Sequence, residues 1–376
     1  MTRVMRAIGF MSGTSMDGVD ITLIESDGET VVRRGEGFLR EYTPSERAII
    51  EEAVAASRDL GDRTARPGPL ALAEDAVTRA HIEAMTAYLT DTGLKPGDID
   101  VAGFHGQTVL HRPEEALTVQ LGDGALLARE TGVDIVYDMR ANDMAHGGQG
   151  APLVPVYHAA LAMGLPSALE PGFGPVAFVN IGGISNVTFV APGVPPVAFD
   201  SGPGNALIDQ WVEQNAGIPF DDGGRIASEG SADMAVVERY LSAPFFARNG
   251  PKSLDRGDFT LDGMAGLELS DGAATLSVLT AAAIARAAEK IETPPALWIV
   301  SGGGARNDAI MDALRAQAGA DTRIVAAGEA GFNADMMEAE AWAYLAVRSR
   351  KGLPLTFPTT TGCREPVTGG NVADPR

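Results

Sequence analysis

The chain has 376 residues, of which 45% are hydrophobic and 21% charged, and its formal net charge is −21. This length exceeds one ordinary hydrophobic core and predicts two domains. The acidic excess argues against a nucleic-acid partner, which would require a basic surface. The single cysteine, Cys363, leaves no internal disulfide and suits a reducing cytosol. No signal peptide is expected, and no apolar run approaches the ~20 residues that span a membrane.

The first 140 residues alternate between strand and helix patterns. Apolar runs and turn residues predict strands over 4–11, 18–26, 30–38, 98–108 and 133–138, and helices over 43–57 and 70–91. This order predicts one α/β domain with a mixed sheet over residues 1–140. The Gly-rich loop over 140–155 marks the expected crossover to a second domain, 141–376.

The second part of the chain repeats the opening pattern. A strand, a Gly/Ser loop and another strand occupy 175–193, as they do near the N-terminus, and a third strand follows over 196–200. We expect a helix from Pro203, further helices over 231–241, 272–291, 307–318 and 334–348, and a strand over 296–304. The sequence therefore predicts two α/β halves that each open with a glycine-containing hairpin.

Three glycine-containing loops are candidates for nucleotide binding. The loop SGTSMDG (12–18) permits positive φ, so consecutive N–H groups can face an anion, but it lacks the GK[ST] ending of a Walker loop. NIGGISN (180–186) is its counterpart, and SGGGARN (301–307) offers flat backbone to an adenosine at a helix N-terminus. Each loop alone is also explained as a structural turn, with Asn307 as a helix N-cap. Together they favour a nucleotide-binding cleft between the two domains.

The motif FDSGPGN (199–205) contains the candidate general base. We expect Asp200 to end a strand just before a helix, whose N-terminus would keep the carboxylate ionised, as a general base must be. The alternative is that Asp200 or Ser201 only caps this helix. Gly202 and Gly204 give a ligand close access to the backbone and favour catalysis.

Polar residues in two further motifs are candidates for substrate contact. His105 and Gln107 follow a predicted strand end, and the five histidines lack the spacing of zinc ligands. Arg140 and Asp143 lie in the Gly-rich loop, where Arg140 can hold a carboxylate through two parallel hydrogen bonds. The alternatives are a structurally satisfied histidine and a solvated interdomain loop.

These motifs, in this order, resemble the anhydro-N-acetylmuramic acid kinase family. The resemblance covers nearly the whole chain and rests on MSGTSMDGVD, HGQT, GGQGAPLVP, NIGGISN, FDSGPGN and GFNADMMEAEAWAYLA. It implies an α/β, two-lobed actin/hexokinase-like (ribonuclease H-like) fold with mixed sheets and an interdomain ATP cleft. The C-terminal segment is then a candidate to pack back on the first lobe.

The activity implied by this resemblance is ATP-dependent opening of 1,6-anhydro-N-acetylmuramic acid by water, with phosphorylation of O6. The products are N-acetylmuramic acid 6-phosphate and ADP, in the recycling of cell-wall peptidoglycan. A cytoplasmic homodimer is also implied. Asp200 would deprotonate the water while the γ-phosphoryl accepts O6, and Asp17 or Asp200 would hold Mg²⁺ through water. The alternatives are a kinase of another small sugar and a non-catalytic actin-like ATPase module.

The resemblance also indicates which residues contact each ligand. The residues at the ATP phosphates are Ser12, Gly13, Thr14, Ser15, Met16, Asp17, Gly18 and Val19. From the other loops we expect nucleotide contacts at Asn180, Gly182, Gly183, Gly202, Gly302, Gly303 and Asn307. At the sugar we expect His105, Gln107, Arg140, Asp143, Gln149 and Glu338, with Arg140 on the lactyl carboxylate. Glu338 resembles the family's acidic residue at the sugar site, and the alternative is a solvated residue on a helix face.

Overall fold

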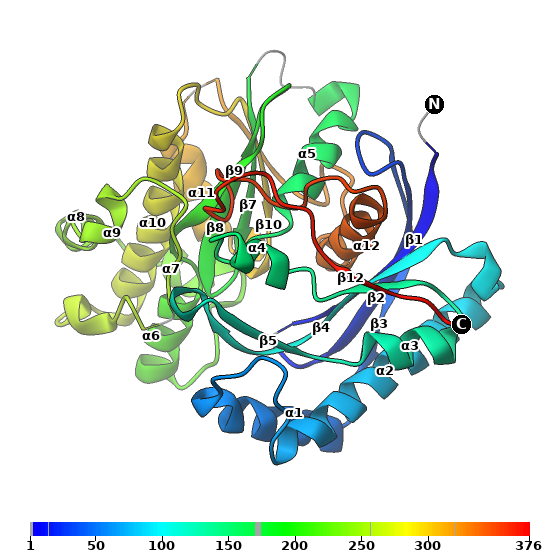
Figure 1. Cartoon of the computed structure of the whole chain (residues 1–376). Helices are drawn as coiled ribbons and strands as arrows, with labels where there is room; N and C mark the ends of the chain where they lie inside the picture. Colours follow the sequence, from blue (N-terminus) through cyan, green and yellow to red (C-terminus); the bar gives the residue numbers. More distant parts are fainter. Residues whose placement is uncertain (1–2, 14, 170–173, 256, 320) are drawn as a thin grey trace. The chain divides into compact units, whose positions relative to one another are not determined.

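The chain divides into two compact units, each with its own β-sheet (Figure 1). Unit 1 comprises Met1–Gly164 and Asp335–Arg376, and unit 2 comprises Leu165–Ala334. The computed structural model describes residues 3–13, 15–169, 174–255, 257–319 and 321–376. Helices and strands alternate in both units, and both sheets mix strand directions, which confirms the predicted α/β class.

In the described part of unit 1, the sheet has seven strands in the order β12-β6-β4-β1-β2-β3, with β5 paired to β4 beside this path. β1 is antiparallel to β2 and parallel to β4. The strands are β1 (Met5–Ser12), β2 (Gly18–Ser26), β3 (Val32–Glu41), β4 (Val101–Arg112), β5 (Leu117–Leu121), β6 (Ile135–Tyr137) and β12 (Asn371–Ala373).

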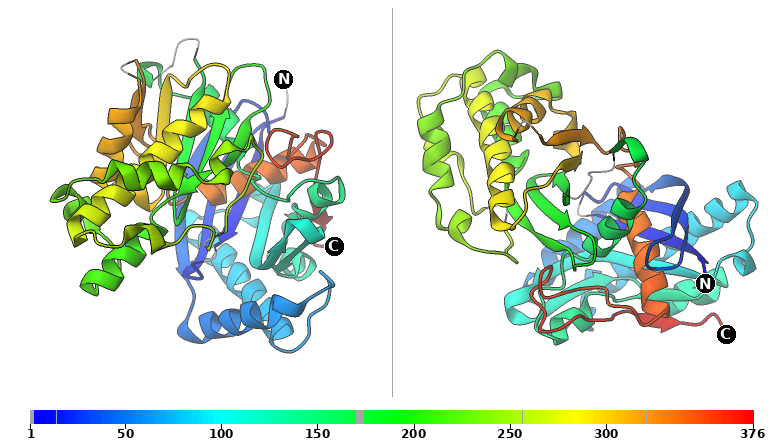
Figure 2. Two further views of the ribbon diagram at one scale, coloured as in Figure 1. Left: turned by 90° about the vertical axis from the view of Figure 1, so that its left-hand side faces the viewer. Right: turned by 90° about the horizontal axis from the view of Figure 1, so that it is seen from above.

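The helices of unit 1 are α1 (Pro44–Ala56), α2 (Pro69–Thr92), α3 (Gly124–Thr131), α4 (Ala141–Ala145), α5 (Pro155–Met163) and α12 (Met337–Arg350). Of these, α1, α2, α3 and α12 contact strands of this sheet, and α5 contacts α12. α12 lies directly on β1 and β4 (Figure 2). A Cβ added at Gly9 of β1 would lie 1.8 Å from Ala339 O, and one at Gly103 of β4 would lie 2.0 Å from Trp342 O. These two glycines therefore allow the backbone of α12 to touch the strands.

In the described part of unit 2, the sheet has five strands in the order β11-β10-β7-β8-β9. The hairpin β7–β8 is antiparallel, whereas β10 is parallel to β7 and to β11. The strands are β7 (Val176–Ile181), β8 (Ile184–Val190), β9 (Val197–Pro203), β10 (Leu297–Ser301) and β11 (Arg323–Ala326). The predicted hairpin over 175–193 is therefore present.

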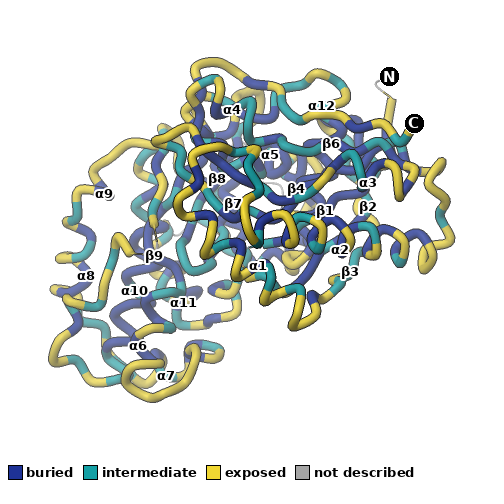
Figure 3. Tube along the Cα trace, turned by 60° about the horizontal axis from the view of Figure 1, so that its bottom comes forward, coloured by how far each residue is buried: buried dark blue, intermediate teal, exposed yellow. Residues whose placement is uncertain are grey.

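The core of unit 2 forms around a central helix, α10 (Leu269–Ala287), which is buried along most of its length (Figure 3). α10 contacts β8, β9 and several other helices. The other helices of unit 2 are α6 (Ala206–Ala216), α7 (Arg225–Ser228), α8 (Met234–Leu241), α9 (Pro244–Ala247) and α11 (Asp308–Gln317). Of these, α6, α7, α8 and α11 contact α10. Trp211 and Phe246 are among the large side chains packed around α10 in this core.

The structure differs from the sequence predictions at the crossover between the units. Residues 141–164, expected in the C-terminal domain, group with unit 1. Residues 335–376 also group with unit 1, in line with the C-terminal segment as a candidate to pack on the first lobe. The reason is a set of buried side-chain bonds within unit 1. Asp143 accepts from Thr356 and Thr361, and Tyr157 donates to Glu340. Helices α3, α4, α5, α7 and α9 and strands β5, β11 and β12 were not predicted.

Candidate active site

The first glycine-containing loop joins β1 to β2 and is tied to β4. Ser12 is buried at the end of β1, and its Oγ donates to Gly106 O at 2.9 Å. Gly13 O accepts from Gln107 Nε2 at 3.0 Å and from Met16 N at 3.2 Å. Met16 has a φ of +52°, in the left-handed region. The Ser12 hydroxyl is therefore engaged inside unit 1, and backbone N–H groups are the donors this loop offers.

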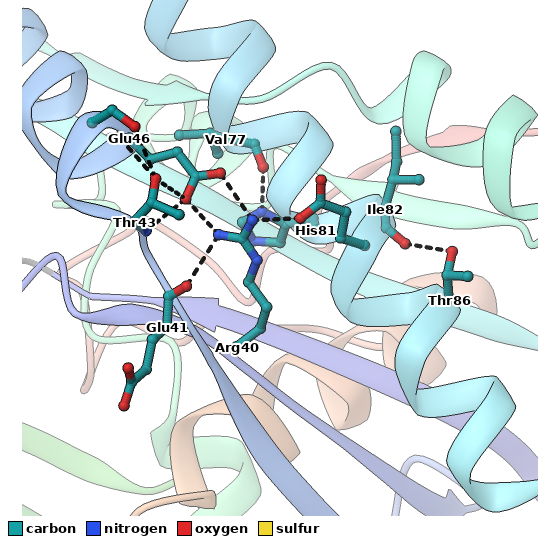
Figure 4. Close-up of polar contacts among 10 residues, drawn as sticks. Arg40, Glu41, Thr43, Glu46, Val77, His81, Ile82 and Thr86 are labelled. Atoms are coloured by element: carbon teal, nitrogen blue, oxygen red, sulfur yellow. Dashed lines mark hydrogen bonds and ion pairs between the residues drawn. The ribbon is translucent and has the colours of Figure 1, made fainter.

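The end of the same loop is supported by β3 and α1. Asp17 is exposed, and its Oδ1 accepts from Ser15 Oγ at 2.7 Å and from Gly18 N at 3.1 Å. A Cβ at Gly18 would lie 2.3 Å from Arg40 O, so glycine is required there. Arg40 in turn binds both oxygens of Glu46, at 2.6 and 2.9 Å, and also Glu83 (Figure 4). This ion network fixes the strand end behind the loop.

Four acidic residues of unit 1 interact beyond this loop. Burial raises the pKa of Asp20, on β2, to about 7, and the charges of Asp17, Glu338 and Asp335 raise it further. Glu338 is exposed, yet partial desolvation raises the pKa of its carboxyl, while Arg140 lowers it. Negative charge is thus concentrated beside the loop, where a bound cation would be favourable.

Arg140 links the Gly-rich loop to β4 and α12. Its Nη1 donates to Gly150 O at 2.8 Å and its Nη2 to His105 Nε2 at 3.1 Å, and its guanidinium carbon lies 5.5 Å from the Trp342 ring centroid. Because arginine only donates, His105 accepts through Nε2, so its neutral ring is protonated at Nδ1. Burial, assisted by Arg140, holds the pKa of His105 well below its usual value. His105 therefore remains neutral and orients Arg140.

Asp143 has its oxygens satisfied within unit 1. Its Oδ1 accepts from Thr356 Oγ1 at 2.5 Å and from Thr361 Oγ1 at 2.7 Å, and its Oδ2 accepts from Gly150 N at 2.7 Å. Gln149, next to Gly150, donates its backbone N–H to Thr361 O at 2.8 Å. These bonds give Asp143 a structural role in ordering the loop that carries Gln149, and its contact with the sugar stays a prediction.

Three loops of unit 2 pack against one another. Asn205 N donates to Gly182 O at 2.7 Å, and Gly204 N donates to Gly183 O at 3.0 Å. A Cβ at Gly302, whose φ is +79°, would lie 2.5 Å from Asn180 Oδ1. The NIGGISN, FDSGPGN and SGGGARN motifs therefore meet in one place, as a nucleotide site requires.

Two residues predicted to contact the nucleotide have structural partners within unit 2, and their nucleotide contacts stay predictions. Asn307 is buried and caps α11, because its Oδ1 accepts from Ile310 N at 3.1 Å. Gly202 faces α10, where an added Cβ would lie 2.6 Å from Ala283 Cβ. In unit 1, Val19 is fully buried in the core, so only its backbone is available. Thr14 lies outside the described residues.

Asp200 lies within β9 and does not end it. The strand continues to Pro203 and α6 begins at Ala206, so the predicted helix is present but its predicted start at Pro203 is wrong. β9 is an edge strand, paired only with β8 among the described strands, and proline is tolerated at an edge. The helix N-terminus therefore does not set the ionisation of Asp200. Ser201 does not cap α6 either; its Oγ lies 2.7 Å from Ser185 Oγ.

The environment of Asp200 combines burial with two favourable contacts. Its Oδ2 accepts from Leu254 N at 2.8 Å, and its backbone N–H donates to Lys252 O at 3.0 Å. Burial raises the pKa of Asp200 to about 6, while the Leu254 N–H and the Lys252 charge lower it and Asp255 raises it. The carboxylate is thus mostly ionised at neutral pH and retains the basicity of a proton acceptor.

A family model described as anhydro-N-acetylmuramic acid kinase matches residues 5–374. The chain belongs to this family. The anhydro-N-acetylmuramic acid kinase of Agrobacterium fabrum is 54% identical over 371 residues, covering 98% of this chain and 99% of that one. The Rhizobium etli relative of the same description is 52% identical over 375 residues, covering 100% of both. A solved ROK hexokinase from Thermus thermophilus aligns over 93% of this chain and 100% of its own, with 13% identity and a TM-score of 0.40.

For this member of the anhydro-N-acetylmuramic acid kinase family, sequence reasoning missed three residues beside the candidate site. Asp20 is the second aspartate of DGVD, and its place beside the first loop is the sequence signal that could have identified it. Trp342 contacts Arg140, and Lys252 contacts Asp200. Both contacts join segments that are distant in the sequence, so no local pattern predicts them. Within the described ranges, no group of three or more His, Cys, Asp or Glu residues is arranged to hold a metal, and no helix has the length and apolarity to span a membrane.

Proposed function

We propose that the chain is an ATP-dependent kinase of 1,6-anhydro-N-acetylmuramic acid. The reaction opens the anhydro ring with water and phosphorylates O6, giving N-acetylmuramic acid 6-phosphate and ADP in peptidoglycan recycling. Family membership over residues 5–374 supports the substrate class. One observation supports the chemistry: the carboxylate of Asp200 has a pKa raised to about 6, and its Oδ2 accepts a hydrogen bond from Leu254 N.

Asp200 serves as the general base. Its carboxylate takes a proton from water, whose oxygen forms a bond to C1 of the sugar as the C1–O6 bond breaks. O6 forms a bond to the γ-phosphorus of ATP as the bond to the β-phosphate oxygen breaks, and ADP leaves. The phosphoryl group thus neutralises the leaving oxygen, so one protein carboxylate suffices where a glycosidase uses two.

The phosphate chain is held by the backbone of the 12–19 and 180–184 loops. Met16 N and Gly18 N already donate to Gly13 O and Asp17 Oδ1, so the proposal takes the remaining backbone N–H groups of the first loop as phosphate donors. The proposal requires that these loops of unit 1 and unit 2 act on one ATP molecule.

Mg²⁺ fits the acidic residues beside the first loop. Asp17 is exposed, and the pKa of Asp20 is raised by burial and, to a smaller extent, by the negative charges of Asp17, Glu338 and Asp335. Because Mg²⁺ keeps several waters and uses few carboxylates, Asp17 is the residue that would hold it through water. The ion supplies charge neutralisation to the phosphates.

The sugar contacts are assigned to Gln107, Arg140 and Glu338 of unit 1. Gln107 Oε1 and Arg140 Nε are buried and have no hydrogen-bond partner among the described residues. An unsatisfied buried polar atom costs about 1–3 kcal/mol, which a bound ligand can recover. We propose that Arg140 Nε–H meets the lactyl carboxylate and Gln107 Oε1 accepts from a sugar hydroxyl.

One coupled assay tests this function. ADP release is followed with the anhydro sugar, its ring-opened form and a panel of hexoses, and the product is identified by mass spectrometry with H₂¹⁸O. We expect turnover with the anhydro sugar alone, and one ¹⁸O at C1. Equal rates with several hexoses would favour a kinase of another sugar, and turnover unaffected by any sugar would favour an actin-like ATPase. Light scattering and cell fractionation test the cytoplasmic homodimer that belongs to this proposal.

A further inference from the structure

A cavity of about 210 Å³ lies beside β4 in unit 1, at the point where β4 changes its neighbouring strand. β4 pairs with β6 up to Phe104 and with β5 from Gln107 onward (Figure 1). His105 and Gly106, which lie between these two pairings, line the cavity. Places where neighbouring strands of an α/β sheet separate commonly bind small molecules.

The charged side chains in the wall of this cavity are paired with one another. Arg63 and Arg66 come from the connection between α1 and α2. Arg63 Nη2 donates to Asp138 Oδ1, and Arg66 Nε donates to Glu74 Oε1 at 2.8 Å. An anion in the cavity would face the two carboxylates, and a cation would face the two guanidinium groups. The wall therefore favours an uncharged polar group.

Two polar atoms in the same wall lack a partner. Arg63 Nε and Gln120 Oε1 are buried and have no hydrogen-bond partner among the described residues. The amide nitrogen of Gln120 donates to Thr108 Oγ1 at 3.1 Å and to Thr118 Oγ1 at 2.8 Å, which leaves Oε1 as the free atom. The cavity therefore offers one donor and one acceptor, and buried atoms of this kind are normally satisfied by water or a ligand.

His105 connects this cavity to the proposed site of the lactyl carboxylate. Its ring lines the cavity, and its Nε2 accepts from Arg140 Nη2 at 3.1 Å. In the proposed substrate the lactyl ether is carried by C3 and the acetamido group by the adjoining C2. A sugar whose lactyl carboxylate meets Arg140 therefore has its acetamido group on the neighbouring ring carbon, as the neighbouring cavity requires.

We propose that this cavity binds the acetamido group of the sugar and makes the enzyme specific for 2-acetamido substrates. This inference rests on the proposed function. A secondary amide is uncharged and supplies the two missing partners: its carbonyl oxygen accepts from Arg63 Nε, and its N–H donates to Gln120 Oε1. Its methyl group packs against Phe104 and Tyr137, which also line the cavity. The space suffices, because one water molecule takes up only about 30 Å³ of the liquid.

The test compares kcat/KM for the anhydro sugar and for its analogue with hydrogen in place of the acetamido group at C2. The wild-type enzyme should prefer the acetamido sugar about 30-fold, because a site that hydrogen-bonds a group discriminates against a ligand that lacks it. Gln120→Met and Arg63→Lys each leave one amide atom unpaired. Both should lower kcat/KM for the acetamido sugar about five- to tenfold and change that for the analogue less than about twofold.

Arg47→Lys is the matched control, because Arg47 is exposed, forms an ion pair with Glu51 and lies outside the cavity wall. Its preference should equal that of the wild type. A wild-type enzyme that uses both sugars equally, or a preference unchanged in either cavity variant, would overturn the inference and leave the proposed function standing. If Gln120→Met does not fold, Arg63→Lys decides alone, since it keeps a cation for Asp138. A wild-type enzyme inactive on the anhydro sugar would instead refute the proposed function.

Discussion

At the scale of single residues, the same side chain, aspartate, has two different roles set by its hydrogen-bond partners. Asp143 accepts three hydrogen bonds that close its own unit. Asp200 accepts one on Oδ2, from a backbone N–H, and remains basic because burial raises its pKa to about 6. The sequence offered both as site candidates because each lies beside glycines. Only the side-chain partners, which come from distant segments, distinguish the two roles.

Asp200→Asn should abolish turnover while leaving ATP binding near normal. The amide cannot accept a proton from water, and general-base catalysis is worth about 10²–10⁴ in rate. In the wild-type enzyme, kcat/KM should fall as the pH drops below about 6, because protonation removes the base. Steady-state kinetics and nucleotide titration by calorimetry check both expectations. A variant with wild-type rate would remove Asp200 from the mechanism.

Asp143→Asn should lower stability more than it changes sugar affinity. The amide replaces one acceptor oxygen by a donor NH₂, which leaves at least one of the three bonds unmade, at about 1–3 kcal/mol. Thermal unfolding measures the loss, and KM for the anhydro sugar should change less than about threefold. A large rise in KM with an unchanged Tm would show that Asp143 contacts the sugar after all.

At the scale of elements, the sequence predicted those whose pattern is local. The hairpins and long helices carry their own periodicity and caps, such as Thr43 at α1. The helix start expected at Pro203 was wrong, because β9 includes that proline and an edge strand accepts proline without losing a ladder bond. The short strands β11 and β12 form only against partners distant in the chain, so their own residues gave no signal.

Gly9→Ala should destabilise unit 1 by about 3 kcal/mol. The new Cβ would meet Ala339 O, a backbone atom that can move only with α12, and overpacking of this kind costs about 1–3 kcal/mol or more. Gly97→Ala is the control, because a Cβ there meets nothing within 4 Å. Urea unfolding of both variants measures the difference. Equal stabilities would show that α12 is not seated directly on β1.

Glu340→Gln should flatten the pH dependence of stability near neutrality. Glu340, on α12, is buried and accepts from Tyr157 of α5 at 2.6 Å, and burial raises its pKa to about 7. The native state then binds the proton more tightly than the unfolded state. The contribution of Glu340 to stability is therefore fully present at acidic pH and is lost as the pH rises through 7. Tm should therefore rise in the variant relative to wild type at pH 8 and not at pH 5.

At the scale of the whole chain, composition predicted a two-part α/β protein and the motifs predicted its family, which the comparisons confirmed. The boundary at 140–141 differed, because the Gly-rich stretch that suggested it lies inside unit 1, where buried bonds hold α4 and α5. The glycine-containing loops could be predicted, because the spacing of glycines is read directly from the sequence. The contacts of Lys252 could not be predicted, because its partners Phe199 and Asp200 lie on β9, about fifty residues earlier in the chain.

Raising the ionic strength should raise Tm. A net charge of −21 makes the folded chain repel itself, and salt screens exposed charges over a Debye length of roughly 10 Å at 0.1 M. Calorimetric scans in about 20 and 200 mM NaCl at pH 7.5 check this, with no nucleotide or magnesium present. A lower Tm in the higher salt would mean that the ion pairs of the fold outweigh its repulsion.

The direct contact of the α12 backbone with Gly9 and Gly103 affects how a movement passes between α12 and the sheet. With bare backbone touching bare backbone, no flexible side chain remains between the two to absorb a displacement. Glu338 stands in the first turn of that helix, and β1 leads straight into the Ser12–Asp17 turn. A displacement of either one should therefore be transmitted to the other, so Glu338 and the turn after β1 should move as a single rigid part.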